Sequence, residues 1–379
     1  EFLLILGIRR LQILLTIRIK HDTGFQVELE QQRIKMAASD NILVIGPSWI
    51  GDMVMAQTLF KCLKQNESQC TLTVMASNWA MPLLARMPEV DASIDAQFGH
   101  GELKLGARRR IGRSLKPSNF TKSIILPNSF KSALIPFHAG IPSRIGWGGE
   151  WRYPLLTDCR RLDRRMFPLM AQRFAALAFA SNSQPPESIP YPRLQVDAID
   201  VKEVLVDFGL EEHGKILAIC PGAEYGEAKQ WPSEHFAEVS NTLIAEGWQV
   251  WILGSTKDAL VAEAIITEIN TENHEFCVNL TGKTTLDQAI DLMSVTSVVV
   301  SNDSGLMHIA SALRRPVVGL FGSTSPRFTP PLTERVKLLA TDIECRPCFK
   351  RTCRYGHRRC LTELEPSLAI MAVHQLADE

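Results

Sequence analysis

The polar turn at residues 301–305 holds residue types that could bind a phosphate or a sugar. It follows residues 298–300, a β-branched run without alternation, which is typical of a strand buried on both faces. A helix is predicted over residues 304–315, and its free N–H groups could receive a phosphate. Gly305 would let the backbone approach the ligand closely, and Asp303 could bond a sugar or ribose hydroxyl. The same spacing is equally compatible with a capping Asp-Ser pair that opens an ordinary helix.

A second polar loop lies where a regular alternation of strands and helices begins. The sequence predicts a strand at 42–45, a loop at 46–52, a helix at 53–63, and further strands at 72–75 and 123–126. Strands separated by helices at this spacing predict a parallel sheet with helices on both faces. The loop is not a dinucleotide fingerprint, because the G-x-G-x-x-G spacing is absent and Pro47 occupies the place of the second glycine.

The second half of the chain opens in the same way as the first. Residues 215–222 match 41–47 position by position, with a proline five residues after the first isoleucine in each. This weak repeat predicts two Rossmann-like, doubly wound α/β domains, 36–190 and 191–379, joined by the Pro-rich connector 181–192. Two such domains facing one another would leave a ligand-binding cleft at the C-terminal ends of their strands.

Composition describes an ordinary globular chain. The 379 residues are 45% hydrophobic and 22% charged, and the 41 basic residues balance the 41 acidic ones. A net charge of zero gives no polyanion signal, so we expect no nucleic-acid partner. No secretory signal is evident, and we therefore expect free thiols in a reducing cytosol.

Residues 1–35 differ from the rest of the sequence. The apolar run 2–17 is broken by Arg9 and Arg10, and it is too short and too charged to span a bilayer. It also lacks a small-residue cleavage site. We expect a non-native or disordered extension, with the folded protein starting near Met36. The alternative is an interfacial amphipathic anchor.

Five segments carry a family resemblance. They are GPSWIGD at 46–52, PNSFKS at 127–132, CPGAEYG at 220–226, KQWP at 229–232 and SNDSGLMH at 301–308. Together they resemble the lipopolysaccharide heptosyltransferases (glycosyltransferase family 9), over the chain from about Met36 to the C-terminus. The resemblance implies the GT-B fold. It also implies transfer of L-glycero-D-manno-heptose from ADP-heptose to the first heptose of the lipopolysaccharide inner core.

The resemblance assigns roles to residues in these segments. An inverting sugar transfer needs a carboxylate that takes the proton of the acceptor hydroxyl, and groups that hold the leaving diphosphate. The resemblance places the base at Asp52, for which capping of the helix at 53–63 is the alternative role. The implied donor-binding residues are Lys229, Asp303, Ser304, Gly305 and His308. For His308, ordinary packing within its helix is the alternative. No D-x-D motif accompanies the diphosphate loop, so we expect no divalent cofactor.

Acceptor contacts are expected from the first domain. The candidates are Ser48, Trp49, Lys131 and Arg144, with a basic run at 104–116 and Arg152 nearby. These cations could hold the carboxylates and phosphates of the growing core. The basic run is equally compatible with an ordinary solvated helix face.

A cysteine cluster lies near the C-terminus. Its members are Cys345, Cys348, Cys353 and Cys360, with His357 close by. Four thiols could hold a structural zinc by residue type, but their spacing is irregular beside common zinc ribbons. Reduced or redox-active thiols are therefore the favoured interpretation.

Two rival functions remain open. One is another core heptosyltransferase, of type I or III, that acts elsewhere on the core. The other is a non-catalytic protein that binds a nucleotide sugar or the membrane surface. For a transferase, the expected location is cytoplasmic, with peripheral contact at the inner face of the cytoplasmic membrane.

Overall fold

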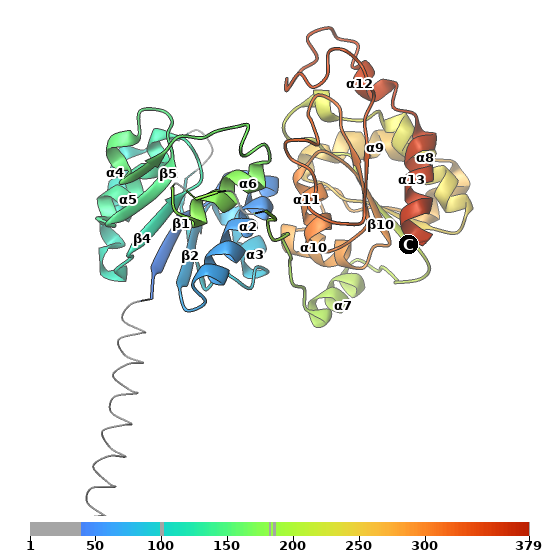
Figure 1. Cartoon of the computed structure of the whole chain (residues 1–379). Helices are drawn as coiled ribbons and strands as arrows, with labels where there is room; N and C mark the ends of the chain where they lie inside the picture. Colours follow the sequence, from blue (N-terminus) through green and yellow to red (C-terminus); the bar gives the residue numbers. More distant parts are fainter. Residues whose placement is uncertain (1–38, 99–101, 182, 185–186, 379) are drawn as a thin grey trace, which may run out of the picture.

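The computed structural model describes residues 39–98, 102–181, 183–184 and 187–378. They form two α/β domains that lie side by side (Figure 1). The expectation for residues 1–35 lies outside the described residues. Within the described ranges, no helix is both long and apolar enough to cross a lipid bilayer.

The first domain is built on a six-stranded sheet in the order β3-β2-β1-β4-β5-β6, in which every neighbouring pair is parallel. Its strands are β1 (Asn41–Ile45), β2 (Thr71–Ala76), β3 (Ala92–Asp95), β4 (Lys122–Ile125), β5 (Ser143–Trp147) and β6 (Asp158–Arg160). Its helices are α2 (Ile50–Asn66), α3 (Met81–Ala85), α4 (Leu105–Ser114), α5 (Leu134–Ala139) and α6 (Met170–Ala175). Short 3-10 turns are η1 (Asn78–Ala80), η2 (Lys116–Ser118), η3 (Phe130–Ala133), η4 (Tyr153–Leu155) and η5 (Ala176–Ala178).

The second domain repeats this topology. Its parallel sheet has the order β12-β11-β10-β7-β8-β9. The strands are β7 (Ile216–Cys220), β8 (Gln249–Ile252), β9 (Cys277–Asn279), β10 (Val298–Asn302), β11 (Val317–Leu320) and β12 (Val336–Leu339). The helices are α7 (Ala198–Asp207), α8 (Ser233–Ala245), α9 (Ala259–Glu268), α10 (Leu286–Ser294), α11 (Gly305–Ala312), α12 (Arg359–Thr362) and α13 (Pro366–Asp378), with 3-10 turns η6 (Glu227–Lys229), η7 (Thr256–Asp258) and η8 (Thr271–Phe276).

The predicted doubly wound architecture is confirmed. The repeated segments 41–47 and 215–222 supply β1 and β7, which occupy equivalent places in the two sheets. In each sheet successive strands are added on one side of this strand and then on the other, so the strand order switches between β1 and β4 and between β7 and β10. Ligands of doubly wound sheets bind at such points, beyond the C-terminal ends of the strands.

Burial explains why these segments become strands. All five residues of β7 and all five of β10 are buried, as expected for central strands covered by helices on both faces. One prediction was wrong in detail. The first helix begins at Ile50, not at Met53, so Asp52 lies inside its first turn and not at the end of the preceding loop.

The two domains meet through the N-terminal turns of α2 and α11, which face each other in the middle of the molecule (Figure 1). A Cβ on Gly51 would lie 2.7 Å from the His308 ring, and a Cβ on Gly305 would lie 2.7 Å from the Ile50 Cβ. Glycine at both positions therefore permits this close approach of the two helices.

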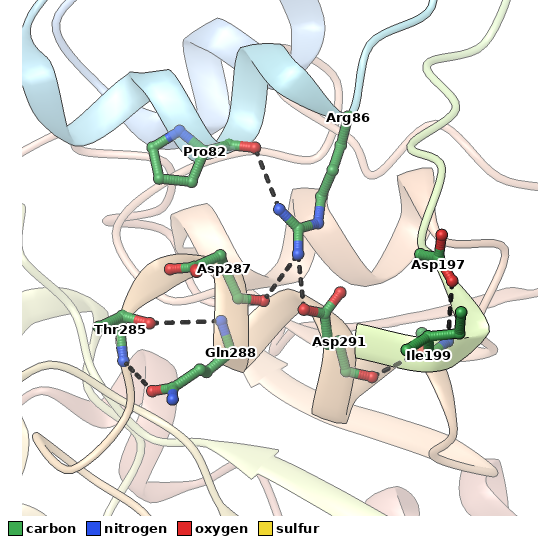
Figure 2. Close-up of polar contacts among 9 residues, drawn as sticks. Pro82, Arg86, Asp197, Ile199, Thr285, Asp287, Gln288 and Asp291 are labelled. Carbon is green, nitrogen blue, oxygen red and sulfur yellow. Dashed lines mark hydrogen bonds and ion pairs between the residues drawn. The ribbon is translucent and has the colours of Figure 1, made fainter. Parts of the chain in front are cut away.

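A second contact joins α3 to α10. The Arg86 guanidinium donates to Asp291 Oδ2 at 2.6 Å and to the Asp287 carbonyl at 3.4 Å (Figure 2). Both side chains of the ion pair are mostly buried, with 13% of Arg86 and 3% of Asp291 exposed. The connector adds to this junction, since Gln195 N–H donates to the Arg86 carbonyl at 2.9 Å. The first domain is thus tied to the helix that begins beside the cleft.

Candidate active site

The N-terminus of α2 brings Asp52 to the cleft. The N-cap residue, Trp49, supplies no side-chain cap, so the first-turn N–H groups are not satisfied by it. Asp52 lies in the first turn of the helix and is half-buried. The alternative role of Asp52 as the N-cap is therefore wrong, because the cap position belongs to Trp49.

The surroundings of Asp52 change its acidity. Burial raises the pKa of Asp52 to about 6, the Lys229 ammonium opposes this rise, and the Asp303 carboxylate adds to it. At neutral pH the carboxylate is ionised. It is nevertheless a stronger base than an ordinary aspartate, which suits it to accept a proton.

Lys229 and Asp303 form the opposite wall. Lys229 Nζ lies 2.7 Å from Asp303 Oδ2, and the Thr324 hydroxyl donates to the same oxygen at 2.6 Å. Lys229 Nζ also donates to the Asp303 carbonyl at 3.2 Å and lies 4.9 Å from the centre of the Tyr225 ring. Asp303 is buried and holds the ammonium in place.

The N-terminus of α11 opens beside this pair. Its N-cap, Ser304, makes no side-chain cap bond to the helix, so the capping role that the spacing allowed is not the one observed. Ser304 Oγ lies 3.2 Å from Ser301 Oγ instead. The free N–H groups and the helix dipole could therefore hold an anion.

His308 is buried on α11 and packs against Gly51. Burial lowers the pKa of His308 to about 4, with Asp303 opposing this change and Lys229 adding to it. The imidazole is neutral at pH 7. It can form a hydrogen bond with a ligand but cannot contribute positive charge.

Two cavities meet at Asp52. An interdomain cavity of about 540 Å³ is lined by the candidate residues Asp52, Lys229, Asp303, Ser304, Gly305 and His308. A first-domain cavity of about 760 Å³ is lined by Ser48, Trp49, Asp52 and Lys131. Trp49, Asp52 and Met170 line both cavities. A group bound in one cavity can therefore meet a group bound in the other beside the Asp52 carboxylate.

The structure does not bring Arg144 to either cavity. It lies near the start of β5, at the opposite end of that strand from the cleft. Its guanidinium donates to the Leu155 and Ile141 carbonyls and lies 5.7 Å from the Phe137 ring centre. The prediction of Arg144 as an acceptor ligand is corrected, because its side chain is used within the first domain.

Other cavity residues carried no clear sequence signal. Arg164 and Arg173 line the first-domain cavity, and Arg173 also lies 4.6 Å from the Phe328 ring centre of the second domain. In the interdomain cavity, Tyr225 lies within a segment that the sequence singled out, whereas Asp258 and Thr285 do not. Except for Arg173, which lies on α6, these residues reach the site through segments that follow strands, where no local spacing marks them.

Three members of the cysteine cluster, Cys345, Cys348 and Cys353, lie on the loop before α12, and Cys360 lies within α12. The four cysteines and His357 line a small cavity of about 20 Å³. All four thiols are free, and within the described chain no three His, Cys, Asp or Glu side chains are grouped closely enough to hold a metal ion. Backbone N–H groups, first that of Arg358, lower the pKa of the Cys353 thiol. That these four cysteines are reduced or redox-active thiols, and do not hold a structural zinc, stays a prediction.

Comparison with known proteins identifies the family. A family model described as glycosyltransferase family 9 (heptosyltransferase) matches residues 108–358, more than half of the chain. This chain belongs to glycosyltransferase family 9. It is a glycosyltransferase of the heptosyltransferase family, as the resemblance implied.

Two curated relatives match nearly the whole chain. Lipopolysaccharide heptosyltransferase 2 of Salmonella typhimurium is 43% identical over 343 residues, which are 89% of this chain and 99% of that protein. Lipooligosaccharide heptosyltransferase 2 of Haemophilus influenzae is 44% identical over 344 residues, again 89% of this chain and 99% of that protein.

A solved structure of a relative has the same fold. The structure of E. coli ADP-heptose lps heptosyltransferase II superposes with a TM-score of 0.81 at 41% identity, covering 89% of this chain and 98% of that one. The GT-B arrangement expected from the resemblance is confirmed.

Proposed function

We propose that this family 9 enzyme transfers L-glycero-D-manno-heptose from ADP-heptose to the first heptose of the lipopolysaccharide inner core, with inversion at the anomeric carbon. The names of its relatives, at 43 and 44% identity over almost their full length, support the choice of sugar and acceptor. The observation that carries the proposal is the position of Asp52, where the two cavities meet opposite Lys229.

In this proposal ADP-heptose occupies the interdomain cavity. Its diphosphate lies against the Lys229 ammonium and the first N–H groups of α11, and Asp303 keeps Lys229 in place. His308 contributes a neutral ring beside the diphosphate. The lipopolysaccharide core occupies the first-domain cavity, where Ser48, Trp49 and Lys131 line the wall.

The reaction then follows from this placement. Asp52 accepts the proton of the acceptor hydroxyl while that oxygen forms a bond to the anomeric carbon. The bond between the anomeric carbon and the β-phosphate oxygen breaks, and ADP leaves with the electron pair. Lys229 and the α11 N-terminus stabilise the negative charge that develops on the diphosphate. We propose that the chain needs no cofactor for this step.

The proposed location is the cytoplasm, at the inner face of the cytoplasmic membrane. The acceptor is attached to a lipid, so the enzyme must meet it at a membrane surface by peripheral contact. No nucleic acid is proposed as a partner, since the net charge of zero offers no general attraction for one.

ADP release with defined core acceptors tests the proposal. We expect release with an acceptor that carries one heptose, and none with a core that lacks heptose. Release only with the heptose-free core would indicate a type I enzyme, and release only with a core of two heptoses a type III enzyme. Binding of ADP-heptose without release on any core would indicate a non-catalytic binding protein.

A further inference from the structure

An exposed tryptophan directly follows Glu150, a residue that lines the first-domain cavity, and we call this edge of the cavity the rim. Trp151 is 82% exposed, and its ring centre lies 6.4 Å from that of Tyr153, which is 60% exposed. Burying such rings is ordinarily favourable, so large exposed aromatic side chains that lie together mark an interaction surface.

The backbone at Trp151 is strained. Arg152 N–H donates to the Gly149 carbonyl at 3.0 Å, which closes a turn with Glu150 and Trp151 at its centre. Their φ angles are 41° and 59°, the left-handed values of a type I′ turn. Glycine and asparagine are preferred at such positions, and a bulky aromatic residue there is strained. The fold therefore holds Trp151 in a backbone conformation that its residue type disfavours.

The turn is anchored on both sides. Arg152 is fully buried and donates to the Trp147 carbonyl at 2.9 Å and to Asn128 Oδ1 at 3.2 Å. Phe130 N–H donates to Glu150 Oε2 at 3.0 Å, and Glu150 itself lines the first-domain cavity. The residues on both sides of Trp151 are thus tied to the cavity wall by hydrogen bonds.

The same rim carries further exposed apolar side chains. Leu103 lines the cavity mouth and is 51% exposed, and Phe130 is 37% exposed. Arg108 joins these parts of the rim, because its guanidinium donates to the Leu103 carbonyl at 2.8 Å and the Lys131 carbonyl at 3.4 Å.

The segment that supplies Leu103 and Phe130 to this rim is strongly basic. No Asp or Glu occurs between Glu102 and Glu150, a stretch that contains nine Lys and Arg residues in a chain of zero net charge. Arg109, Arg110 and Arg113 are exposed on α4, directly after the Leu103 segment. The two flanking acids are already engaged, Glu102 with Lys104 at 2.9 Å and Glu150 with Phe130 N–H.

We propose that this rim is the surface that docks on an anionic membrane. Trp151 and Tyr153 enter the interface between headgroups and acyl chains, as amphipathic aromatic rings do, and the α4 arginines lie over the anionic headgroups. The mouth of the acceptor cavity then faces the lipid that carries the acceptor. This inference rests on the proposed function for the acceptor, but the docking itself is measured without any acceptor.

Vesicle binding by the full chain tests the docking surface. We expect co-sedimentation with vesicles that mix phosphatidylethanolamine and phosphatidylglycerol, and much weaker binding to phosphatidylcholine alone. Trp151→Ala with Tyr153→Ala should weaken binding at least roughly tenfold. Replacing Arg109, Arg110 and Arg113 by serine should weaken it roughly 100-fold, since each basic residue near an anionic surface contributes separately.

Matched controls come from the second domain. Leu260 on α9 is 78% exposed, and Leu260→Ala should leave vesicle binding unchanged.

Trp151→Gly provides a further check on folding, because glycine relaxes the left-handed φ of 59°. This variant should melt at a higher temperature and yet bind vesicles less, a combination that partial unfolding cannot produce.

An acyl-free, water-soluble core acceptor separates docking from the reaction. The Trp151→Ala and Tyr153→Ala double variant should release ADP with this acceptor at the wild-type rate, within about twofold. A loss of that activity would assign the rings to the glycan and overturn the docking proposal, as would unchanged vesicle binding by this variant. Absence of wild-type binding to the anionic vesicles would also overturn it. ADP release by the wild type with the soluble acceptor reports on the proposed function separately.

Discussion

Lys229 and Asp303 lie 74 residues apart in sequence and form an ion pair with 2.7 Å between Nζ and Oδ2. The pair is 13% exposed on the lysine side and 5% on the aspartate side. Lys229 is therefore held by a buried partner before any ligand arrives, and it is not the solvated surface lysine that its sequence neighbourhood would allow. Substitution of either residue should therefore change the charge state or the position of the other.

Lys229→Ala should weaken use of ADP-heptose. One charged hydrogen bond to a diphosphate contributes about 1.5–3 kcal/mol, so we expect the KM for ADP-heptose to rise roughly 10- to 150-fold. The same change leaves the buried Asp303 carboxylate without its cation, so the melting temperature should fall as well. Adding Asp303→Asn should restore much of the stability but not the donor affinity. Recovery of both would show that Lys229 serves only to neutralise Asp303.

Asp52→Asn should abolish turnover while the protein stays folded and binds ADP-heptose. Loss of a general base costs about 10²–10⁴-fold in rate, and asparagine keeps the shape of the side chain without its basicity. Because burial raises the pKa of Asp52, its ionised form destabilises the folded state as pH rises from 3.8 towards and above 6. The melting temperature of Asp52→Asn at pH 8 should accordingly equal or exceed that of the wild type. Normal turnover by a well-folded Asp52→Asn enzyme would exclude the base role.

The pH dependence of kcat/KM should follow the ionisation of the Asp52 carboxylate. Only ionised Asp52 can accept the proton, so activity should fall about tenfold per pH unit below a midpoint near 6. Asp303→Asn removes a group that raises the pKa of Asp52 and should move this midpoint to lower pH. Lys229→Ala removes the opposing cation and should move it to higher pH. Shifts in the reverse directions would place a different group in control of the profile.

The interdomain ion pair between Arg86 and Asp291 should support donor binding from a distance. Asp291 lies on α10, and Thr285, Leu286 and Ala289 at the start of this helix line the interdomain cavity. Arg86→Met leaves a buried carboxylate unpaired, which typically costs about 3–5 kcal/mol of folding free energy. Burial raises the pKa of Asp291 and Arg86 opposes this, so the loss should be larger at pH 8 than at pH 5.

Two measurements check the Arg86 prediction. Thermal unfolding at both pH values should show the difference, and Asp291→Asn added to Arg86→Met should recover stability at pH 8. Donor titrations should show a higher KM for ADP-heptose in Arg86→Met with a small change in kcat. A stability loss that is independent of pH would indicate lost packing of the arginine stem and not an unpaired charge.

Activity should survive EDTA. No D-x-D motif accompanies the diphosphate loop, and Lys229 with the α11 N-terminus can hold the leaving group's charge. Loss of ADP release that Mg²⁺ restores would contradict this expectation. Loss together with unfolding would point instead to the cysteines at 345–360.

The sequence alone determined the order of the elements and the loops that carry chemistry. Apolar runs such as residues 298–300 and 216–219 specify buried strands, because a strand covered on both faces has no alternation. Polar turns after those strands, at 46–52 and 301–305, must lie at the C-terminal edge of a parallel sheet. Residues in these turns, including Asp52 and Ser304, could be placed in a cleft for that reason.

Tertiary structure decided which of the candidates meet and what state they are in. Lys131 lines the cavity and Arg144 does not, although both are basic residues close to strands of the first domain. The raised pKa of Asp52, the lowered pKa of His308 and the holding of Lys229 by Asp303 all arise from packing between residues far apart in sequence. The outward Trp151 likewise depends on Arg152 being buried against residues 127–132. Burial and charge pairing depend on which surfaces are brought together, and local spacing along the chain does not contain that information.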